Sequence, residues 1–530
     1  MRRGSGVLLH ISSLPGRFGV GTLGKPAYDF VDQLHEAEQI YWQILPCTPP
    51  GYGDSPYQST SAFAGNPAFI DLDLLIEEGL LEESDLKDIP KPAKADAADY
   101  ALEQKYRPPL LLKAYKRGAE KYAADFHRFK QDNGDWLFDY SLFEAFRTHF
   151  GEVSWKEWPE EIRRRDPEAE MRLIFELTDE IDAVQFTQFL FFDQWRRLRE
   201  YANQHDVHII GDIPLYVSPD SVEAWAYPYL FRSDHAIAGT PPDAFSADGQ
   251  NWGNPIYDWH HMAEHGYDWW VKRMRHNMME YDFVRFDHFR GIESYYVIPE
   301  GAPAKDGHWE QGPGRALIDT LRYHLGELPI IAEDLGFLTQ GVHDLLAYCG
   351  FAGTKVLQFA FDDPNSIYLP HNYPRNCVVY TGTHDNNTTR GWYVHDLIPA
   401  VRERVGAYFG SVDAETISDR MIRAAMMSIA DVAITPMQDI LGLPESARMN
   451  YPSISLGNWK WRLTEGQFDS SHIETLHRMT HAYGRNYRAW PQPDDHPLQE
   501  QQADAEEAQT EAPAEAKKTR RKAPAKAKKS

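Results

Sequence analysis

Short apolar runs alternate with longer amphipathic stretches along most of this chain. Eight of the runs predict buried parallel strands, because they are continuously apolar rather than alternating with polar residues. They are Val7–His10, Tyr41–Leu45, His208–Ile213, Phe283–Asp287, Ile330–Glu333, Lys355–Phe359, Cys377–Tyr380 and Val432–Pro436. Helical patterns lie between them, for example at Ala27–Gln39, Tyr267–Met279 and Gly314–Leu325. Eight strand and helix units predict an α/β fold, namely a (β/α)8 TIM barrel.

One interval in this pattern is much longer than the others. About 160 residues separate the second and third predicted strands, far more than a single crossover requires. The stretch from about 74 to 185 consists mostly of charged, amphipathic helix patterns. We therefore expect a helical insertion that packs on the barrel and is not a separate catalytic domain.

The composition changes abruptly after Trp490. No large apolar residue follows Leu498, so the segment 492–530 cannot offset its ordering entropy and is predicted to be a disordered, charged tail. Residues 1–491 are predicted to form the catalytic domain. The last 14 residues contain eight Lys or Arg. The tail could tether the protein to nucleic acid or an anionic surface, but a solvated extension is the favoured interpretation, since no aromatic residue is interleaved for base stacking.

Overall charge restricts the class of ligand. The formal net charge of −25 argues against nucleic acid or another anionic substrate for the body of the protein, whereas a neutral polymer such as a glucan is compatible with it. Aromatic residues make up 13% of the chain, which suits stacking on sugar faces as well as a large core. Composition alone does not separate these two uses.

Cysteine usage and hydropathy indicate a cytoplasmic protein without a cofactor. The three cysteines, Cys47, Cys349 and Cys377, are far apart and are interpreted as reduced thiols rather than disulfide partners or zinc ligands. The apolar run near the N-terminus is too short for a signal peptide, and no run is long enough to span a membrane. Neither a Walker-type loop nor a GxGxxG after a strand is present, so neither a cofactor nor a metal site is predicted.

Three short sequence motifs each place a carboxylate at the end of a predicted strand. They are Asp287 in VRFDHFRG, Glu333 in IIAEDLG and Asp385 in YTGTHDNNT. Active sites of (β/α)8 barrels lie at the C-terminal ends of the strands. Retaining cleavage of a glycosidic bond requires one ionised carboxylate and one carboxylic acid about 5 Å apart. The three motifs therefore predict chemistry on a glycosidic bond, with the third carboxylate binding ring hydroxyls.

The neighbours of two carboxylates suggest different roles. Arg285 and Asp287 are two residues apart on a strand and so share a face, where the cation would keep the Asp287 carboxylate ionised. Glu333 follows three apolar residues, and a partly desolvated carboxyl has a raised pKa that suits an acid. Asp334 is expected to point the other way.

The segment from Gly239 to Asn254 has the composition of an ordered lid. It is long, rich in Pro and Gly, and contains Phe245, Gln250 and Trp252. Such a segment is either a surface loop or a lid over an acceptor chain that excludes water.

Eight motifs in order resemble the 4-α-glucanotransferase family, also called amylomaltase or disproportionating enzyme, a branch of the α-amylase-like barrel enzymes. The resemblance runs from about Gly4 to Trp490. The motifs are GVLLHISSLPG, GYGDSPYQSTSAFAGNP, GDIPLYV, GTPPDAFSADGQNWGNPIYDW, VRFDHFRG, AEDLG, GTHDNNT and GNWKWR.

The resemblance implies retaining transfer of α-1,4-linked glucosyl segments between maltooligosaccharides or other α-1,4-glucans. It implies that Asp287 is the nucleophile, Glu333 the acid/base and Asp385 the transition-state stabiliser. The further substrate-binding residues that it implies are Arg285, His384, Tyr57, Asp212, Gln250 and Trp252. It also favours the lid interpretation of 239–254.

Two positions depart from the family pattern, and two other functions stay open. Ala244 stands where Tyr is common, and Ser453 where Gly is usual; both bear on chain-length preference and cyclisation rather than on the reaction class. An α-1,4-glucan hydrolase would use the same site, and a catalytically silent glucan-binding protein would not need all three carboxylates. We expect the transferase.

Overall fold

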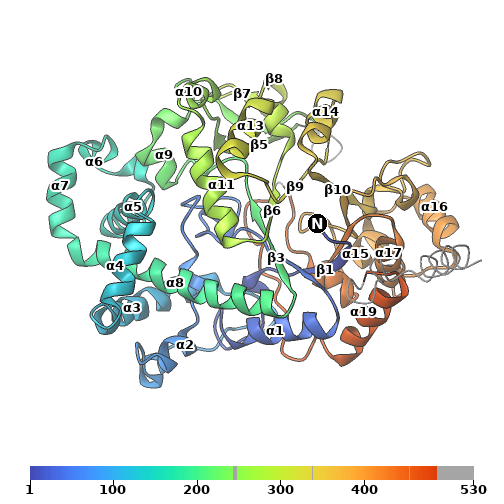
Figure 1. Cartoon of the computed structure of the whole chain (residues 1–530), viewed down its shortest axis with the longest axis horizontal. Coiled ribbons are helices and arrows are strands. Elements are labelled where there is room, and N and C mark those ends of the chain that lie inside the picture. The colour runs from blue at the N-terminus through green and yellow to red at the C-terminus, as the bar shows by residue number, and fades with distance from the viewer. Residues whose placement is uncertain (243–247, 337, 453, 486–530) are drawn as a thin grey trace, which may run out of the picture. The chain divides into compact units, whose positions relative to one another are not determined.

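The eight predicted strands form a closed parallel barrel in the computed structural model (Figure 1), which describes residues 1–242, 248–336, 338–452 and 454–485. The barrel strands are β1 (Gly4–Leu8), β2 (Tyr41–Gln43), β3 (His208–Ile213), β6 (Phe283–Phe286), β9 (Ile330–Ala332), β10 (Ala352–Val356), β11 (Cys377–Tyr380) and β12 (Val432–Pro436). Neighbours follow the order β1, β12, β11, β10, β9, β6, β3, β2, and β2 pairs with β1 to close the ring. The predicted (β/α)8 barrel is confirmed.

Two strands begin earlier than the apolar pattern predicted. Strand β1 begins at Gly4 rather than Val7, and β10 begins at Ala352 rather than Lys355. Glycines occupy these early positions because the backbone is crowded there: a Cβ on Gly6 would lie 2.2 Å from the carbonyl oxygen of Tyr41 on β2. The apolar pattern did not reveal these first strand residues, because glycine has no side chain.

The helices surround the barrel, and the three that were predicted lie within three residues of their expected ends. Outside the insertion the helices are α1 (Lys25–Glu36), α9 (Val222–Ala226), α10 (Trp259–Glu264), α11 (Asp268–Glu280), α12 (Arg290–Glu293), α13 (Gly314–Leu325), α14 (Gln340–Cys349), α15 (Thr389–Gly391), α16 (Pro399–Phe409), α17 (Ile417–Met427), α18 (Met437–Ile440) and α19 (Ser470–Ala482).

Helices also fill the long interval between β2 and β3. They are α2 (Leu72–Glu77), α3 (Tyr100–Gly118), α4 (Ala123–Asp132), α5 (Leu137–His149), α6 (Glu160–Arg163), α7 (Pro167–Glu176) and α8 (Thr178–Gln204). Figure 1 shows α3 to α7 on one side of the barrel strands, with α8 extending back toward them. Helix α8 runs past residue 185, the expected end of the helical insertion. Its buried Phe186 packs edge-to-face on Phe126 of α4, with ring centroids 5.2 Å apart.

Two buried glutamines of α8 hold the loop that follows β2. The side chain of Gln188 accepts from the Gly65 amide (2.8 Å) and donates to the Gly65 carbonyl (2.9 Å). Gln194 makes the same pair of bonds with the backbone of Asp71, at 2.7 and 3.1 Å. Buried backbone groups need hydrogen-bond partners. The side chains of α8 supply the partners that a neighbouring strand would supply in a sheet, and they hold this loop in position.

A second, antiparallel sheet lies outside the barrel and was not predicted. Its order is β5 (Gln250–Pro255), β4 (Ile237–Thr240), β7 (Ser294–Ile298), β8 (His308–Gln311). The segment 239–254 was described as a loop, but its described ends belong to the paired strands β4 and β5. Its role as a lid stays a prediction. Residues 243–247, including Ala244 and Phe245, lie outside the described residues, as does Ser453.

Residues Met1–Arg485 form one unit of the fold. The predicted tail at 492–530, and the last residues of the predicted catalytic domain, lie outside the described residues. All three cysteines are buried and unpaired. Among the helices of the described residues, none has the length and apolar character needed to cross a membrane.

Replacing Gly6 tests the close approach of β1 and β2. We expect Gly6→Ala to destabilise the protein by about 3 kcal/mol or more, because the new methyl group meets the backbone oxygen of Tyr41 and the strands must separate. Thermal and denaturant unfolding would measure the loss. Gly406→Ala, in α16 with no atom within 4 Å of the new Cβ, is the matched control and should be neutral or stabilising. Equal behaviour of the two variants would contradict the proposed crowding.

Candidate active site

Three neighbouring barrel strands bring their last residues together. Asp212 of β3 pairs in register with Arg285 of β6, and Phe286 of β6 pairs with Ala332 of β9. Asp287 and Glu333 each follow directly, and both are held by backbone bonds to the adjacent strand: the Asp287 amide to the Ile213 carbonyl and the Glu333 amide to the Phe286 carbonyl, each at 3.0 Å. The two carboxyl groups therefore lie at adjacent strand ends on the C-terminal face of the barrel.

Arg285 connects two carboxylates from neighbouring strands. Its Nη1 lies 2.9 Å from Asp287 Oδ1, and 2.9 and 2.7 Å from the two oxygens of Asp212. The side chains of Arg285 and Asp212 are buried, whereas that of Asp287 is 27% exposed and can reach a ligand. Burial works against the charge on Arg285, but the two carboxylates outweigh it and raise the pKa of the guanidinium.

Glu333 differs from an ordinary glutamate in its pKa. Burial raises the pKa of Glu333 to about 7; the negative charge of Asp287 adds to this rise, whereas Arg285 opposes it. Backbone amides fix both oxygens: Oε2 accepts from His288 (2.8 Å) and Oε1 from Leu335 (2.9 Å). His288 presents its amide from the left-handed region of backbone conformation, with φ 53°. A strained residue next to a polar cluster is typical of a functional site.

Asp385 lies beyond β11 and has a separate set of partners. Its Oδ1 accepts a hydrogen bond from Asn450 Nδ2 at 2.7 Å and lies 3.4 Å from His384 Nε2. Arg448 donates to the Asp385 carbonyl at 2.7 Å. The Asp385 side chain is 48% exposed, so it is oriented by these partners while it stays open to solvent.

Tyr57 connects these groups. Its hydroxyl donates to Asp212 Oδ2 at 2.8 Å, and its ring stacks on His384, with centroids 5.1 Å apart and planes at 17°. The Trp459 ring lies against both, at 5.8 and 5.9 Å. Burial lowers the pKa of His384, which favours the neutral imidazole.

Strand β5 brings the lid segment to the same place. The Trp252 ring meets His288 edge-on, with centroids 4.9 Å apart, and its indole nitrogen donates to Gln250 Oε1 at 3.2 Å. Gln58, next to Tyr57, donates to the Trp252 carbonyl (3.3 Å) and to Asn254 Oδ1 (3.2 Å). The structure thus places Trp252 beside His288, the residue that follows Asp287. Gln250 contacts Trp252.

Comparison with known proteins shows which family this chain is similar to. The model of the 4-alpha-glucanotransferase family matches residues 9–468. The chain belongs to the 4-alpha-glucanotransferase family. It is 48% identical over 493 residues to the 4-alpha-glucanotransferase of Streptococcus pneumoniae serotype 4, covering 91% of this chain and 98% of that one. A chloroplastic/amyloplastic 4-alpha-glucanotransferase of Arabidopsis thaliana is 41% identical, covering 91% and 86%.

Solved structures agree with this assignment. An amylomaltase from Streptococcus agalactiae in complex with acarbose superposes with a TM-score of 0.89 at 42% identity, covering 91% of this chain and 100% of that one. Corynebacterium glutamicum amylomaltase superposes with a TM-score of 0.71 at 21% identity, covering 92% and 75%, which shows a common fold.

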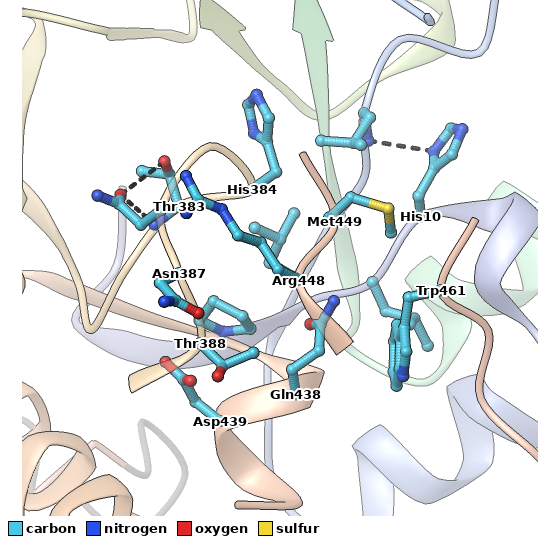
Figure 2. A pocket seen from close by; sticks show the side chains of 15 residues that line it. His10, Thr383, His384, Asn387, Thr388, Gln438, Asp439, Arg448, Met449 and Trp461 are labelled. Atoms are coloured by element: carbon cyan, nitrogen blue, oxygen red, sulfur yellow. Dashed lines mark hydrogen bonds between the residues drawn. The ribbon is translucent and has the colours of Figure 1, made fainter. Parts of the chain in front are cut away.

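Two cavities of this 4-alpha-glucanotransferase family member are lined by His384 and by Tyr57, respectively. One of about 450 Å³ is lined by His384, Arg448, Gln438 and Trp461, and Figure 2 shows these side chains around it with Asp439 at its base. The other, of about 400 Å³, is lined by residues that include Tyr57, Asp212 and Tyr216. The two cavities therefore each contact one member of the stacked Tyr57 and His384 pair.

Sequence reasoning missed two residues that orient the carboxylates. His288 lies inside a motif that was recognised, but its role comes from a backbone amide, which no side-chain pattern reveals. Asn450 lies three residues before Ser453 and is 65 residues away from Asp385, so spacing carried no signal. Asp334 does face away, as expected, with Oδ2 3.6 Å from Lys355 Nζ.

The raised pKa of Glu333 predicts an alkaline limb in the activity profile. A carboxyl that must donate a proton is active below its pKa, so kcat/KM for a maltooligosaccharide should fall as pH rises through about 7. Initial rates from about pH 3.5 to 9 would measure it. A limb centred near the ordinary Glu value of about 4.3 would contradict the assignment. Burial also raises the pKa of Asp212 to about 7, so Asp212→Asn is the control, and its residual activity should keep the limb.

Removing the partner of Asp385 should reduce turnover. We expect Asn450→Ala to lower kcat by about tenfold or more, because a hydrogen bond to a charged group contributes about 1.5–3 kcal/mol. Asn376→Ala is the control: this asparagine binds the carbonyls of Gly350 and Phe351, before β10, at the other end of the barrel. A normal kcat in Asn450→Ala with an unchanged melting temperature would show that Asp385 is held by other means.

Proposed function

We propose that this protein is a retaining 4-α-glucanotransferase. It moves α-1,4-glucan segments from a donor maltooligosaccharide to the 4-hydroxyl of glucose or of another glucan. Family membership supports the activity, and the similar amylomaltase that binds acarbose supports an oligosaccharide ligand in this site. The proposal extends to the roles of individual residues, which rest on the geometry above.

One observation carries the assignment of roles: two carboxyl groups at adjacent strand ends have opposite electrostatic surroundings. Asp287 accepts a hydrogen bond from the Arg285 guanidinium at 2.9 Å. Glu333 has a pKa raised to about 7 by burial, which favours the protonated form. Retaining glycoside chemistry requires one carboxylate that acts as the nucleophile and one carboxylic acid that donates a proton.

The reaction then proceeds in two displacements. Asp287 attacks the anomeric carbon of the donor while Glu333 gives its proton to the leaving glycosidic oxygen, so that the carbon–oxygen bond breaks and a covalent glycosyl-enzyme forms. Glu333, now a carboxylate, accepts the proton of the acceptor hydroxyl. That oxygen attacks the anomeric carbon and releases Asp287, so the linkage keeps its configuration.

The remaining groups support the sugar at the reacting position. Asp385, oriented by Asn450, is suited to bind ring hydroxyls as positive charge develops in the transition state. The Tyr57 ring supplies a flat apolar surface. A hydrogen bond from its hydroxyl to Asp212 and stacking on the His384 ring fix its position. Asp212 also shares Arg285 with the nucleophile, so it sets the position of the guanidinium.

Transfer requires that a sugar hydroxyl reaches the intermediate before water does. The strand β5 lies against the residue that follows Asp287, and Gln58 anchors it there. A fixed aromatic side chain at this place supports a role for Trp252 in holding the acceptor and excluding water.

The decisive experiment incubates the purified protein with maltotriose and follows product lengths and total reducing ends together. We expect a ladder with chains longer than the input and a constant concentration of reducing ends. Only shorter products with rising reducing ends would establish the hydrolase instead. No change, with maltotriose and with longer donors, would favour a binding protein.

Substitution of the two carboxyl groups completes this test. Asp287→Asn and Glu333→Gln should each lose more than about a thousandfold in turnover while the melting temperature is retained. Asp306→Asn, at an exposed aspartate in the 3-10 helix before β8, is the matched control. Retained activity in either carboxyl variant would refute the role of that residue.

A further inference from the structure

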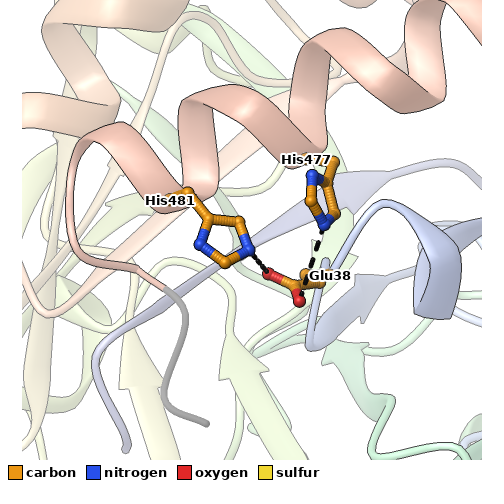
Figure 3. Close-up of side chains that lie close together, drawn as sticks. All are labelled: Glu38, His477 and His481. Atoms are coloured by element: carbon orange, nitrogen blue, oxygen red, sulfur yellow. Dashed lines mark ion pairs between the residues drawn. The ribbon is translucent and has the colours of Figure 1, made fainter. Parts of the chain in front are cut away.

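Three potential metal ligands meet at the end of the barrel opposite the carboxylates. His477 and His481 lie four residues apart on one face of α19, and Glu38 lies in the turn between α1 and β2 (Figure 3). Their ligand atoms all lie within 4.8 Å of one another. Among the described residues, this is the one group of three or more His, Cys, Asp or Glu side chains that meets this criterion.

The side chains already converge on a common point. Glu38 Oε2 is 2.9 Å from His481 Nε2, and Oε1 is 3.7 Å from His477 Nε2. Figure 3 shows both imidazoles pointing toward the carboxylate. The exposed fractions are 23% for Glu38, 43% for His477 and 44% for His481, so an ion and a water molecule have access.

The geometry requires little adjustment. Zn²⁺ binds imidazole nitrogen and carboxylate oxygen at about 2.0–2.2 Å in a tetrahedron, which separates ligand atoms by about 3.3–3.5 Å. The observed separations extend to 4.8 Å at most, so rotations of exposed side chains are sufficient. Two histidines one helical turn apart are a frequent zinc-binding arrangement, because i and i+4 share a face.

The backbone around Glu38 is held rigidly against α19. Gln39 and Thr480 are both buried, and Gln39 Nε2 donates to Thr480 Oγ1 at 2.9 Å, next to His481. The Gln39 amide bonds to the Leu34 carbonyl at 2.8 Å, and Glu38 itself is in the left-handed region, with φ 54°. Arg478, between the histidines, is directed to Glu474 and Thr475. The ligand-bearing elements are therefore in position before any ion binds.

We propose that Glu38, His477 and His481 form a binding site for Zn²⁺ or a similar divalent transition metal, with water in the fourth position. The sequence predicted no metal site, because Glu38 is far from the two histidines in the chain. The ion would join α19, the last helix of the described residues, to the turn that enters β2. Because it binds only the folded protein, it stabilises the fold and leaves the chemistry of the active site unchanged.

Calorimetric titration of the full chain with Zn²⁺, in a buffer that does not bind metal, tests the proposal. We expect one equivalent that is absent from the double variant His477→Gln/His481→Gln, and at least about tenfold weaker binding in Glu38→Gln. The matched control is His261→Gln/His265→Gln, a histidine pair with the same spacing at the C-terminal end of α10, where His265 follows the last helical residue. It should keep the equivalent.

Two further readouts distinguish the site from general histidine binding. Zn²⁺ should raise the melting temperature of the parent and of the α10 control, but not that of the α19 double variant. Circular dichroism and maltotriose disproportionation in the absence of metal should be the same for all variants, which checks folding. Absence of Zn²⁺ binding by the parent, or binding that survives loss of both α19 histidines, would overturn the proposal.

Discussion

The carboxylate site depends on the hydrogen bonds that the buried guanidinium of Arg285 makes to two carboxyl groups. The guanidinium is bonded to Asp212 on one strand and to Asp287 at the end of its own, so a single cation sets the position of both groups. A buried charge without partners costs several kcal/mol, and here Nη1 of the guanidinium is hydrogen-bonded to both carboxyl groups. Asp212 is completely buried and Asp287 is not, so the inner carboxylate balances the cation while the outer one remains available to a ligand.

Loops outside the barrel complete this site, and elements far away in the chain hold those loops. The segment after β2 carries Tyr57, and the backbone further along it is bonded to Gln188 and Gln194 of α8. The long helical insertion therefore has a physical connection to the site: it supplies the helix that fixes the loop. Asp385 depends in the same way on Asn450, which lies beyond β12. Precise placement of the polar groups requires such partners, because a strand end alone does not determine a side-chain rotamer.

The second sheet gives the lid segment its register. Strand β4 pairs with β7 as well as with β5, so Trp252 is positioned by a sheet rather than by a free loop. This sheet was not predicted because two of its strands are short and polar: HWEQ and QNWGNP lack the continuous apolar character of the barrel strands. At the opposite face of the barrel, the contacts between α19 and the turn before β2 close the structure by joining its first and last parts.

The sequence by itself determined the barrel and the strand ends at which carboxylates stand. A strand buried on both faces must be continuously apolar, so the eight strands were visible locally, and Asp287, Glu333 and Asp385 were visible as the polar residues that follow three of them. Tertiary structure alone decided which groups meet. The His288 amide beneath Glu333, the Asn450 bond to Asp385 and the Glu38, His477 and His481 cluster join residues whose separation in the chain carries no pattern. The raised pKa of Glu333 was expected from its apolar neighbours, but its size depends on burial and on the charges of Asp287 and Arg285, which are established only when the barrel closes.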